Sequence, residues 1–93
     1  MQQTSHDSLT VAESVLDLVG NTPVLKMHSM DTGVCELFLK LESQNPGQSI
    51  KDRIAISMIK KAQQDGQLTP GVRIIEATAG NTGIALALVA SQM

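Results

Sequence analysis

The feature that most constrains the fold of this chain is an order of strand, polar loop and helix that occurs twice. Strands are indicated where apolar residues alternate or run together, and helices where they recur every three or four residues. In chain order, the sequence predicts a strand over 36–42, the loop NPGQS, a helix over 50–65, a strand over 72–77, a loop over 78–83, and a helix from 84 to 93. A repeated strand–loop–helix order predicts an α/β fold with a parallel sheet and flanking helices.

The helix over 50–65 has the clearest local signals. Ser49 and Asp52 have the S-x-x-D spacing of a capping box, and Gly66 ends the apolar repeat. The apolar positions between them recur at helical spacing: Ile54, Met58, Ile59 and Ala62.

The amino-terminal third predicts smaller elements. Thr10 and Glu13 have capping-box spacing, which predicts a short helix that ends at Gly20. Residues 24–27 follow Pro23 and predict a strand, because proline is tolerated where a strand begins. We expect residues 1–9 to be flexible and residues 10–93 to form one α/β unit.

Composition excludes several classes of function. The net charge is −2 and the seven basic residues are dispersed, so no surface for nucleic acid is expected. The lone Cys35 allows no internal disulfide, and His6 and His28 lie far from it in sequence, so we expect no metal site. Phe38 is the only aromatic residue, so the core must come from aliphatic side chains.

The ends and apolar runs indicate a cytoplasmic protein. The amino terminus MQQTSHDSLT has neither the basic nor the apolar region of a secretory signal. No apolar run reaches the roughly 18 residues of a membrane span. The helix that starts at Ile84 reaches the last residue, Met93, without a cap, so we expect the chain to be a fragment.

Two loops could carry chemistry. Ligands in open α/β sheets bind outside the carboxyl ends of strands, where helix amides face anions. The stretch NPGQSIKDR places Lys51 in a first helical turn, where a cation is disfavoured by about 0.3–1 kcal/mol. Partial burial there would favour the neutral amine, which is a nucleophile. The second loop offers Thr78, Asn81 and Thr82.

A structural role is the alternative for both loops. Lys51 could simply be solvated, and TAGNTG could be a turn in which Thr82 caps a helix. Neither loop contains G-x-G-x-x-G or G-x-x-x-x-G-K-[ST], so the nucleotide-binding fingerprints are not matched.

Four segments in order resemble the N-terminal part of the cysteine synthase and cystathionine β-synthase family. They are LVGNTPVLKM, FLKLESQNPG, NPGQSIKDR and EATAGNTGIALA, and the resemblance covers about residues 14–93. The resemblance implies a fold type II, tryptophan synthase β-like enzyme that depends on pyridoxal 5′-phosphate (PLP). Residues 10–93 would then be the N-terminal portion of its catalytic domain.

The resemblance also assigns site residues. Lys51 matches the family's catalytic lysine, which forms the Schiff base with the cofactor, and Asn81 matches the asparagine that binds the cofactor's 3′-oxygen. The loop that receives the substrate carboxylate matches Thr78, Ala79, Gly80, Asn81 and Thr82. Ala79 stands where many members have serine, so one hydroxyl is missing.

The implied activity is β-replacement on L-serine or O-acetyl-L-serine with sulfide or homocysteine. The alternatives are a β-eliminating serine or threonine dehydratase on the same fold and a noncatalytic carboxylate-binding module. The family's glycine-rich phosphate loop and pyridine-nitrogen partner match nothing in these 93 residues. We therefore expect no catalysis by this fragment alone. The resemblance implies a homodimer for the complete protein, and we expect no nucleic-acid or membrane partner.

Overall fold

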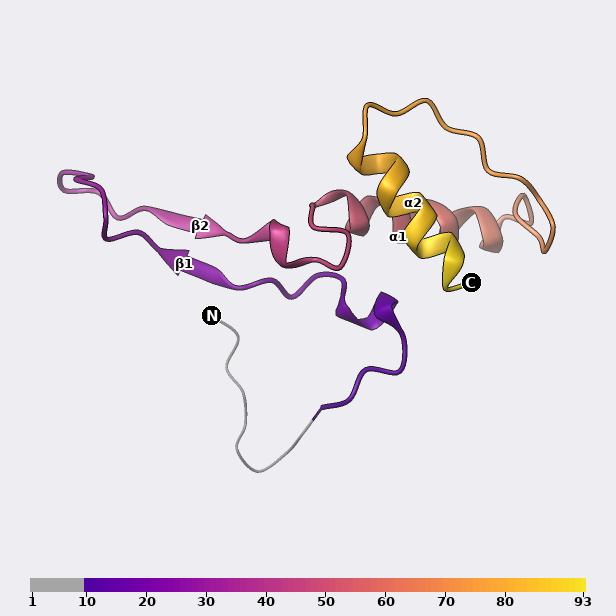
Figure 1. The fold of residues 1–93 in the computed structure, drawn as a ribbon, viewed down its shortest axis with the longest axis horizontal. Helices are drawn as coiled ribbons and strands as arrows, with labels where there is room; N and C mark the ends of the chain where they lie inside the picture. The colour runs from indigo at the N-terminus through magenta and orange to yellow at the C-terminus, as the bar shows by residue number, and fades with distance from the viewer. Residues whose placement is uncertain (1–9) are drawn as a thin grey trace.

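The structure is a computed structural model that describes residues 10–93 (Figure 1). A two-stranded hairpin lies at one end, and a pair of packed helices lies at the other. The flexible segment expected over 1–9 lies outside the described residues.

The helix α1 spans Lys51–Gln64, within one residue of the prediction at each end. The expected capping box is wrong in its details. The Ser49 hydroxyl accepts the Lys51 N–H at 3.2 Å, whereas the Asp52 carboxylate turns back and accepts the Gly47 N–H at 2.5 Å. The helix ends at Gly66 as predicted, where φ is +76° and glycine has no steric penalty.

The helix α2 spans Asn81–Ser91 and begins three residues before the expected start at Ile84. The earlier start follows from Thr78, whose hydroxyl oxygen accepts the N–H groups of Gly80 and Gly83, each at 3.1 Å. Part of the polar loop is therefore helical, and Thr78, rather than Thr82, caps it.

The core lies between α1 and α2. Small residues let the two helices approach closely, and the buried apolar residues are Ala55 and Ile59 of α1 and Ala85, Leu86 and Val89 of α2. The partly buried Leu16, Ile56 and Leu68 pack around this core. Both helices begin on the side of the pair that faces the hairpin (Figure 1).

The hairpin consists of β1, Val24–Lys26, and β2, Phe38–Lys40, with Leu25 opposite Leu39. These strands pair antiparallel, so the parallel sheet expected from the sequence is not formed by the described residues. The short connection over 27–37 makes β1 and β2 antiparallel, since a parallel pair needs a crossover of about a dozen residues or more. The expected parallel sheet is missing because its second strand, over 72–77, does not form. Gly33, with φ at +66°, turns the chain back within this connection.

The segment 72–77 is the second correction. It crosses above the helix pair as an extended segment (Figure 1), but it pairs with no other described segment and is not a strand. Ile74 and Glu76 line a groove of about 310 Å³ together with Gly83, Leu86, Ala87 and Ala90 of α2. An apolar run needs a neighbouring strand to form the backbone hydrogen bonds of a sheet, and no described strand pairs with residues 72–77.

Two short 3₁₀ helices complete the description. η1 spans Val15–Leu18, and its capping box uses Ser14 and Asp17, so the box expected at Thr10 and the longer helix after it are wrong. η2 spans Glu42–Gln44 and leads from β2 into the loop 45–50. None of the helices in residues 10–93 is long and apolar enough to cross a membrane.

Candidate active site

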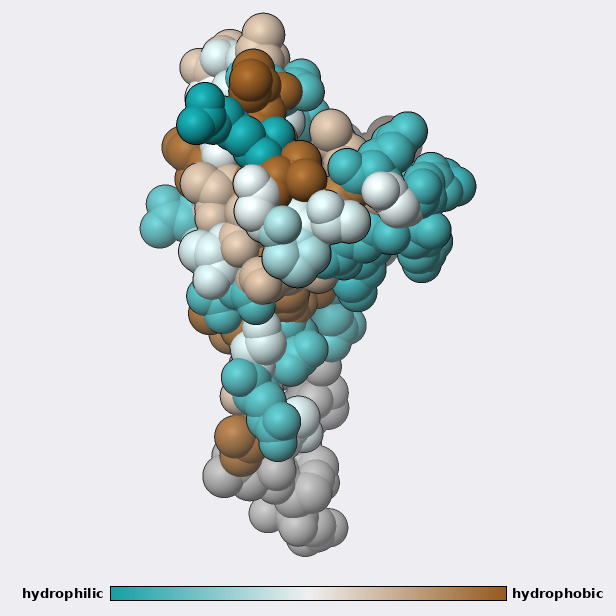
Figure 2. All heavy atoms as spheres, turned by 90° about the vertical axis from the view of Figure 1, so that its right-hand side faces the viewer, coloured by the Kyte–Doolittle hydropathy of each residue, from teal (hydrophilic) through white to brown (hydrophobic). Residues whose placement is uncertain are grey.

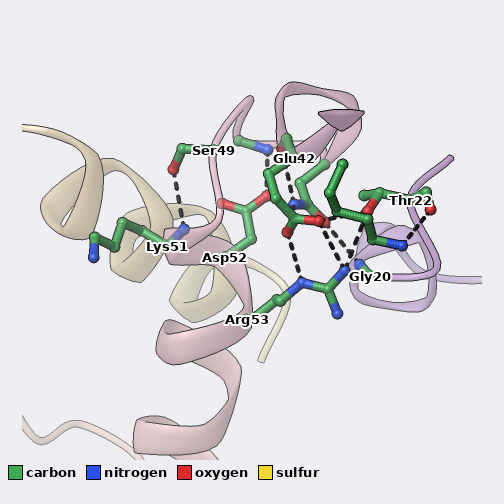
Figure 3. A network of polar contacts seen from close by, with 10 residues as sticks. Gly20, Thr22, Glu42, Ser49, Lys51, Asp52 and Arg53 are labelled. Carbon is green, nitrogen blue, oxygen red and sulfur yellow. Dashed lines mark hydrogen bonds and ion pairs between the residues drawn. The ribbon is translucent and has the colours of Figure 1, made fainter. Parts of the chain in front are cut away.

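Lys51 is the first residue of α1 and is partly buried. Its side chain extends away from Arg53 and Glu42 (Figure 3). Within residues 10–93 its Nζ atom has no hydrogen-bond or ion-pair partner, whereas Lys26, Lys40 and Lys61 each have one. The Lys51 amine is therefore free of interactions that would compete with a ligand.

The Asp52 side chain leaves the same turn in a different direction from Lys51 (Figure 3) and is fully buried. Its Oδ2 accepts the Gly47 N–H, and its Oδ1 has no partner among the described residues. A side chain at position 47 would collide with this carboxylate, so the loop before α1 requires glycine there. Asp52 thus ties the first turn of α1 to the loop 45–50.

Arg53 forms a two-pronged ion pair with Glu42 of η2 (Figure 3). Its Nε donates to Oε1 at 2.7 Å and its Nη2 donates to Oε2 at 3.1 Å. The Thr22 hydroxyl donates to the same Oε2 at 2.5 Å. Arg53 and then Thr22 hold the pKa of Glu42 down at about 2, so this carboxylate stays ionised.

Asn45 connects this ion pair to the amino-terminal loop. Its side-chain NH₂ donates to Glu42 Oε1 at 3.1 Å, and its Oδ1 accepts the Gly20 N–H at 2.7 Å. Lys40 of β2 donates to the Thr22 carbonyl at 2.6 Å. The loop after η1, the hairpin and the start of α1 are therefore one hydrogen-bonded unit.

The loop 78–82 presents polar groups at the start of α2. Thr78, Ala79, Gly80 and Asn81 are exposed, and Thr82 is partly buried. Within the described residues, the backbone N–H groups of Asn81 and Thr82 donate no hydrogen bond. Such groups at a helix N-terminus favour an anion such as a carboxylate.

The structure places the candidate residues on two neighbouring helices. Lys51 opens α1 and Asn81 opens α2, and the two helices pack against each other. No hydrogen bond joins the Lys51 side chain to the loop 78–82 in the part of the chain that the structure describes. The Lys51 amine and the N–H groups that open α2 are therefore not engaged with each other.

Sequence reasoning missed Thr22, Glu42, Asn45 and Arg53, and it gave Asp52 only a capping role. The available signal was the position of Arg53 and Asp52 directly after Lys51, which placed three charged residues in one helical turn. Their partners could not be read from the sequence, because they lie in different segments. The described residues contain no group of three or more His, Cys, Asp or Glu that could hold a metal ion.

Matches to known proteins place this chain in a class of protein, the fold type II PLP enzymes. Residues 15–93 match the family described as pyridoxal-phosphate dependent enzyme. The chain belongs to this family. The expected fold class and the expected cofactor are thereby confirmed at the level of the family.

Individual relatives are similar over most of this chain. A cysteine synthase of Staphylococcus aureus is 47% identical over 78 residues, which are 83% of this chain and 25% of that enzyme. Among solved structures, a hydrogen sulfide-producing enzyme from Fusobacterium nucleatum has a TM-score of 0.86 at 50% identity, over 88% of this chain and 27% of that one.

An O-acetylserine dependent cystathionine β-synthase from Helicobacter pylori has a TM-score of 0.80 at 42% identity, over 89% of this chain and 28% of that one. The chain thus spans about a quarter of the length of the relatives it matches.

The residues present fit PLP. An aldehyde needs an amine without a competing partner, which Lys51 provides. An anionic substrate needs unpaired donors, which the N–H groups of Asn81 and Thr82 provide. No described side chain of the first turn of α1 forms an ion pair with Lys51 that would have to break first.

Proposed function

We propose that the protein that carries this chain catalyses PLP-dependent β-replacement on L-serine or O-acetyl-L-serine, with sulfide or homocysteine as the acceptor. The observation that carries the proposal is a lysine with a free amine that opens α1, in a chain of the PLP family whose relatives include cysteine synthases. In the net reaction a Cβ–O bond of the substrate breaks, acetate or water leaves, and the sulfur of the acceptor forms a Cβ–S bond.

Each site residue has a part in this proposal. PLP supplies an aldehyde and an electron sink for the bond changes at the amino acid. Lys51 would hold that aldehyde through its Nζ, and its amine, once free again, would remove the proton from Cα of the substrate. The Asn81 side chain would bind the 3′-oxygen of the cofactor.

The loop 78–82 would bind the substrate carboxylate through exposed N–H groups and the Thr82 hydroxyl. Thr78 contributes mainly by shaping the loop, because its oxygen already accepts two backbone N–H groups. Ala79 offers only its backbone N–H, so this site has one hydroxyl donor fewer than a serine would give.

The choice of donor follows from relatives alone. The Helicobacter pylori protein is described as O-acetylserine dependent and as a cystathionine β-synthase, which supports O-acetyl-L-serine as donor and a cystathionine product. The relatives named cysteine synthase support a cysteine product instead. We also propose a homodimer in the cytoplasm, which light scattering and cell fractionation would test.

Trapping with borohydride tests the role of Lys51. PLP is added to the protein that carries this chain, the carbon–nitrogen bond is reduced, and peptides are mapped by mass spectrometry. We expect the label on Lys51, with Lys60 as a reference on the same helix. A label on Lys60 or Lys40 in place of Lys51 contradicts the proposal. Carboxylate binding without any label would instead favour a noncatalytic binding module.

A β-eliminating enzyme is the second candidate. It is favoured by one observation, the structural similarity to an enzyme described as producing hydrogen sulfide. Product analysis with and without added thiol separates the two candidates. A thioether or cysteine product that requires added thiol or sulfide supports replacement, and a 2-oxo acid formed without it supports elimination.

A further inference from the structure

We propose that Asp52 and Arg53 are positioning residues that fix the location and direction of the Lys51 side chain. Asp52 acts through the backbone of the loop 45–50, and Arg53 acts through Glu42 and Thr22. This inference rests on the proposed role of Lys51, and it adds two residues that touch neither the cofactor nor the substrate.

The burial of Asp52 is the first observation. A polar group is costly to bury without hydrogen-bond partners, and the Asp52 carboxyl is fully buried with only one hydrogen bond, from the Gly47 N–H. Capping of α1 does not require the burial of Asp52, because the Ser49 hydroxyl already accepts a first-turn N–H. The contact instead holds the loop that delivers Lys51 against the helix.

The geometry of Arg53 is the second observation. A two-pronged pair between a guanidinium and a carboxylate restricts orientation as well as distance. Glu42 is held in turn by Thr22 and Asn45, both of which are buried. Arg53 is therefore bound to a carboxylate that cannot easily move, and this fixes the rotation of α1 relative to the hairpin.

The two contacts together determine where Lys51 points. Successive residues of an α-helix are about 100° apart around its axis, since one turn has 3.6 residues. Asp52 and Arg53 therefore anchor two directions of the first turn, and the third direction belongs to Lys51. Figure 3 shows the three side chains leaving the helix toward different sides.

The test measures the selectivity of labelling, not stability. The protein that carries this chain is treated with PLP and borohydride, and the ratio of label on Lys51 to label on Lys60 is measured by mass spectrometry. Helical content is recorded for each variant by circular dichroism. A purely structural role would lower helical content without a specific loss at Lys51.

Three variants of the anchors and one control are compared. Asp52→Ala removes the acceptor, and Arg53→Lys keeps the charge but loses the two-pronged geometry. Asp52→Asn keeps an oxygen that can accept the Gly47 N–H. The control is Asp65→Asn, which removes the exposed Lys61–Asp65 pair at the other end of α1.

We expect the Lys51 to Lys60 ratio to fall about ten- to a hundredfold in Asp52→Ala and Arg53→Lys, because a misplacement of about 1 Å can cost that much in reactivity. Asp52→Asn should retain most of the ratio, and Asp65→Asn should equal the unmodified protein. If Asp52→Ala or Arg53→Lys loses its helical signal, two other variants test the inference in its place. Gly47→Ala and Thr22→Val disturb the same two contacts from the partner side, and we expect both to lower the Lys51 to Lys60 ratio.

Two results would overturn the inference, and they are distinguishable. An unmodified protein that is labelled on Lys51, with variants that keep the same ratio, removes the positioning role and leaves the proposed function intact. An unmodified protein without selective label on Lys51 removes the proposed function and the positioning role together.

Discussion

Glu42 joins parts of the described chain that lie far apart in sequence. Thr22 and Arg53 lie 20 and 11 residues away from it in sequence, and both bind its carboxylate. Because these groups bind the ionised form, they lower the pKa of Glu42 from 4.5 to about 2. These contacts thus contribute to the stability of the folded state while Glu42 is charged.

This linkage gives a pH dependence with a defined sign. A carboxyl with a lower pKa in the folded state contributes stability above its unfolded pKa, and the contribution is lost as the pH falls through its folded pKa. We expect Glu42→Gln to lower the unfolding midpoint at pH 7, and this difference from the unmodified protein should shrink between about pH 4.5 and pH 2. Thermal unfolding at several pH values measures it.

Glu36→Gln is the matched control, because Glu36 pairs with Lys26 at 3.3 Å on the exposed hairpin. Exposed pairs contribute about 0–1 kcal/mol, so this variant should behave nearly like the unmodified protein at every pH. A constant loss in Glu42→Gln from pH 7 to pH 2 would show that the charge of Glu42 is not what stabilises the fold.

Substitution of Gly20 tests how firmly Arg53 is held by Glu42 and Thr22. Its φ is +86°, and a Cβ there would lie 3.1 Å from Arg53 Nη1. Gly71 has nearly the same φ, +89°, but nothing lies within 4 Å of its would-be Cβ. Left-handed backbone costs a non-glycine residue about 1–2 kcal/mol, so Gly71→Ala should lose that much and Gly20→Ala should lose more.

Denaturant unfolding of the two alanine variants measures this difference. In an Arg53→Ala background the excess cost of Gly20→Ala should disappear, because the crowding group is gone. Equal losses for Gly20→Ala and Gly71→Ala in the unmodified background would mean that Arg53 moves aside without cost.

The sequence indicates a special role for some of these residues and not for others. Lys51 stands out in the sequence because a cation in a first helical turn is unfavourable, which is a local signal, and its role in holding the cofactor stays a prediction. Glu42 and Arg53 were not found, since their pairing depends on how η2 and α1 are oriented. Asp52 was assigned to a helix cap because spacing cannot show that its carboxylate turns back to Gly47.

At the scale of elements, the start of α2 depends on one hydroxyl. Thr78 accepts the N–H groups of Gly80 and Gly83 and so satisfies donors that the helix leaves unpaired. Thr78→Val keeps the shape and removes the acceptor, so it should cost about 0.5–2 kcal/mol and reduce helical content. Thr78→Ser keeps the oxygen and should be nearly neutral. Circular dichroism and denaturant unfolding compare them.

Gly83 provides a check on this assignment. A Cβ at position 83 would lie 2.6 Å from the Thr78 methyl group, so Gly83→Ala should be less harmful in the Thr78→Ser background. Equal stability of Thr78→Val and Thr78→Ser would show that the hydroxyl is not the cap of α2.

The elements that the sequence predicted best are those with local causes. α1 needs only its own apolar repeat and the glycine that ends it, so its bounds were predicted to within one residue. The segment 72–77 has the composition of a strand, but a strand exists only beside another strand, and composition does not supply a partner. The antiparallel direction of β1 and β2 follows from the short length of their connection.

The whole molecule exposes much apolar surface for its size. Figure 2 shows hydrophobic side chains lying among polar ones on the face at the far end from the hairpin. Among the residues of the described part, Val72, Ile74 and Ile75 are all exposed, as are Val24, Leu25 and Phe38 of the hairpin. Such a distribution is typical of surfaces that are covered by other protein.

The last prediction is that the 93-residue chain on its own is only marginally stable. The buried apolar core has five residues and two of them are alanine. Burial of each large side chain contributes about 1.5–3 kcal/mol, while ordering each residue's backbone costs about 1–2 kcal/mol. We expect broad thermal unfolding, strong binding of a hydrophobic dye, and self-association at high concentration, measured by circular dichroism, fluorescence and light scattering.

Two serine variants separate the effect of the exposed apolar surface from that of the buried core. Ile75 is 85% exposed and Val89 is fully buried, so Ile75→Ser should reduce dye binding and keep helical content, whereas Val89→Ser should abolish the helical signal. A sharp, concentration-independent transition without dye binding would contradict marginal stability. It would mean that contacts such as the Thr22–Glu42–Arg53 cluster hold the chain together where its small core does not.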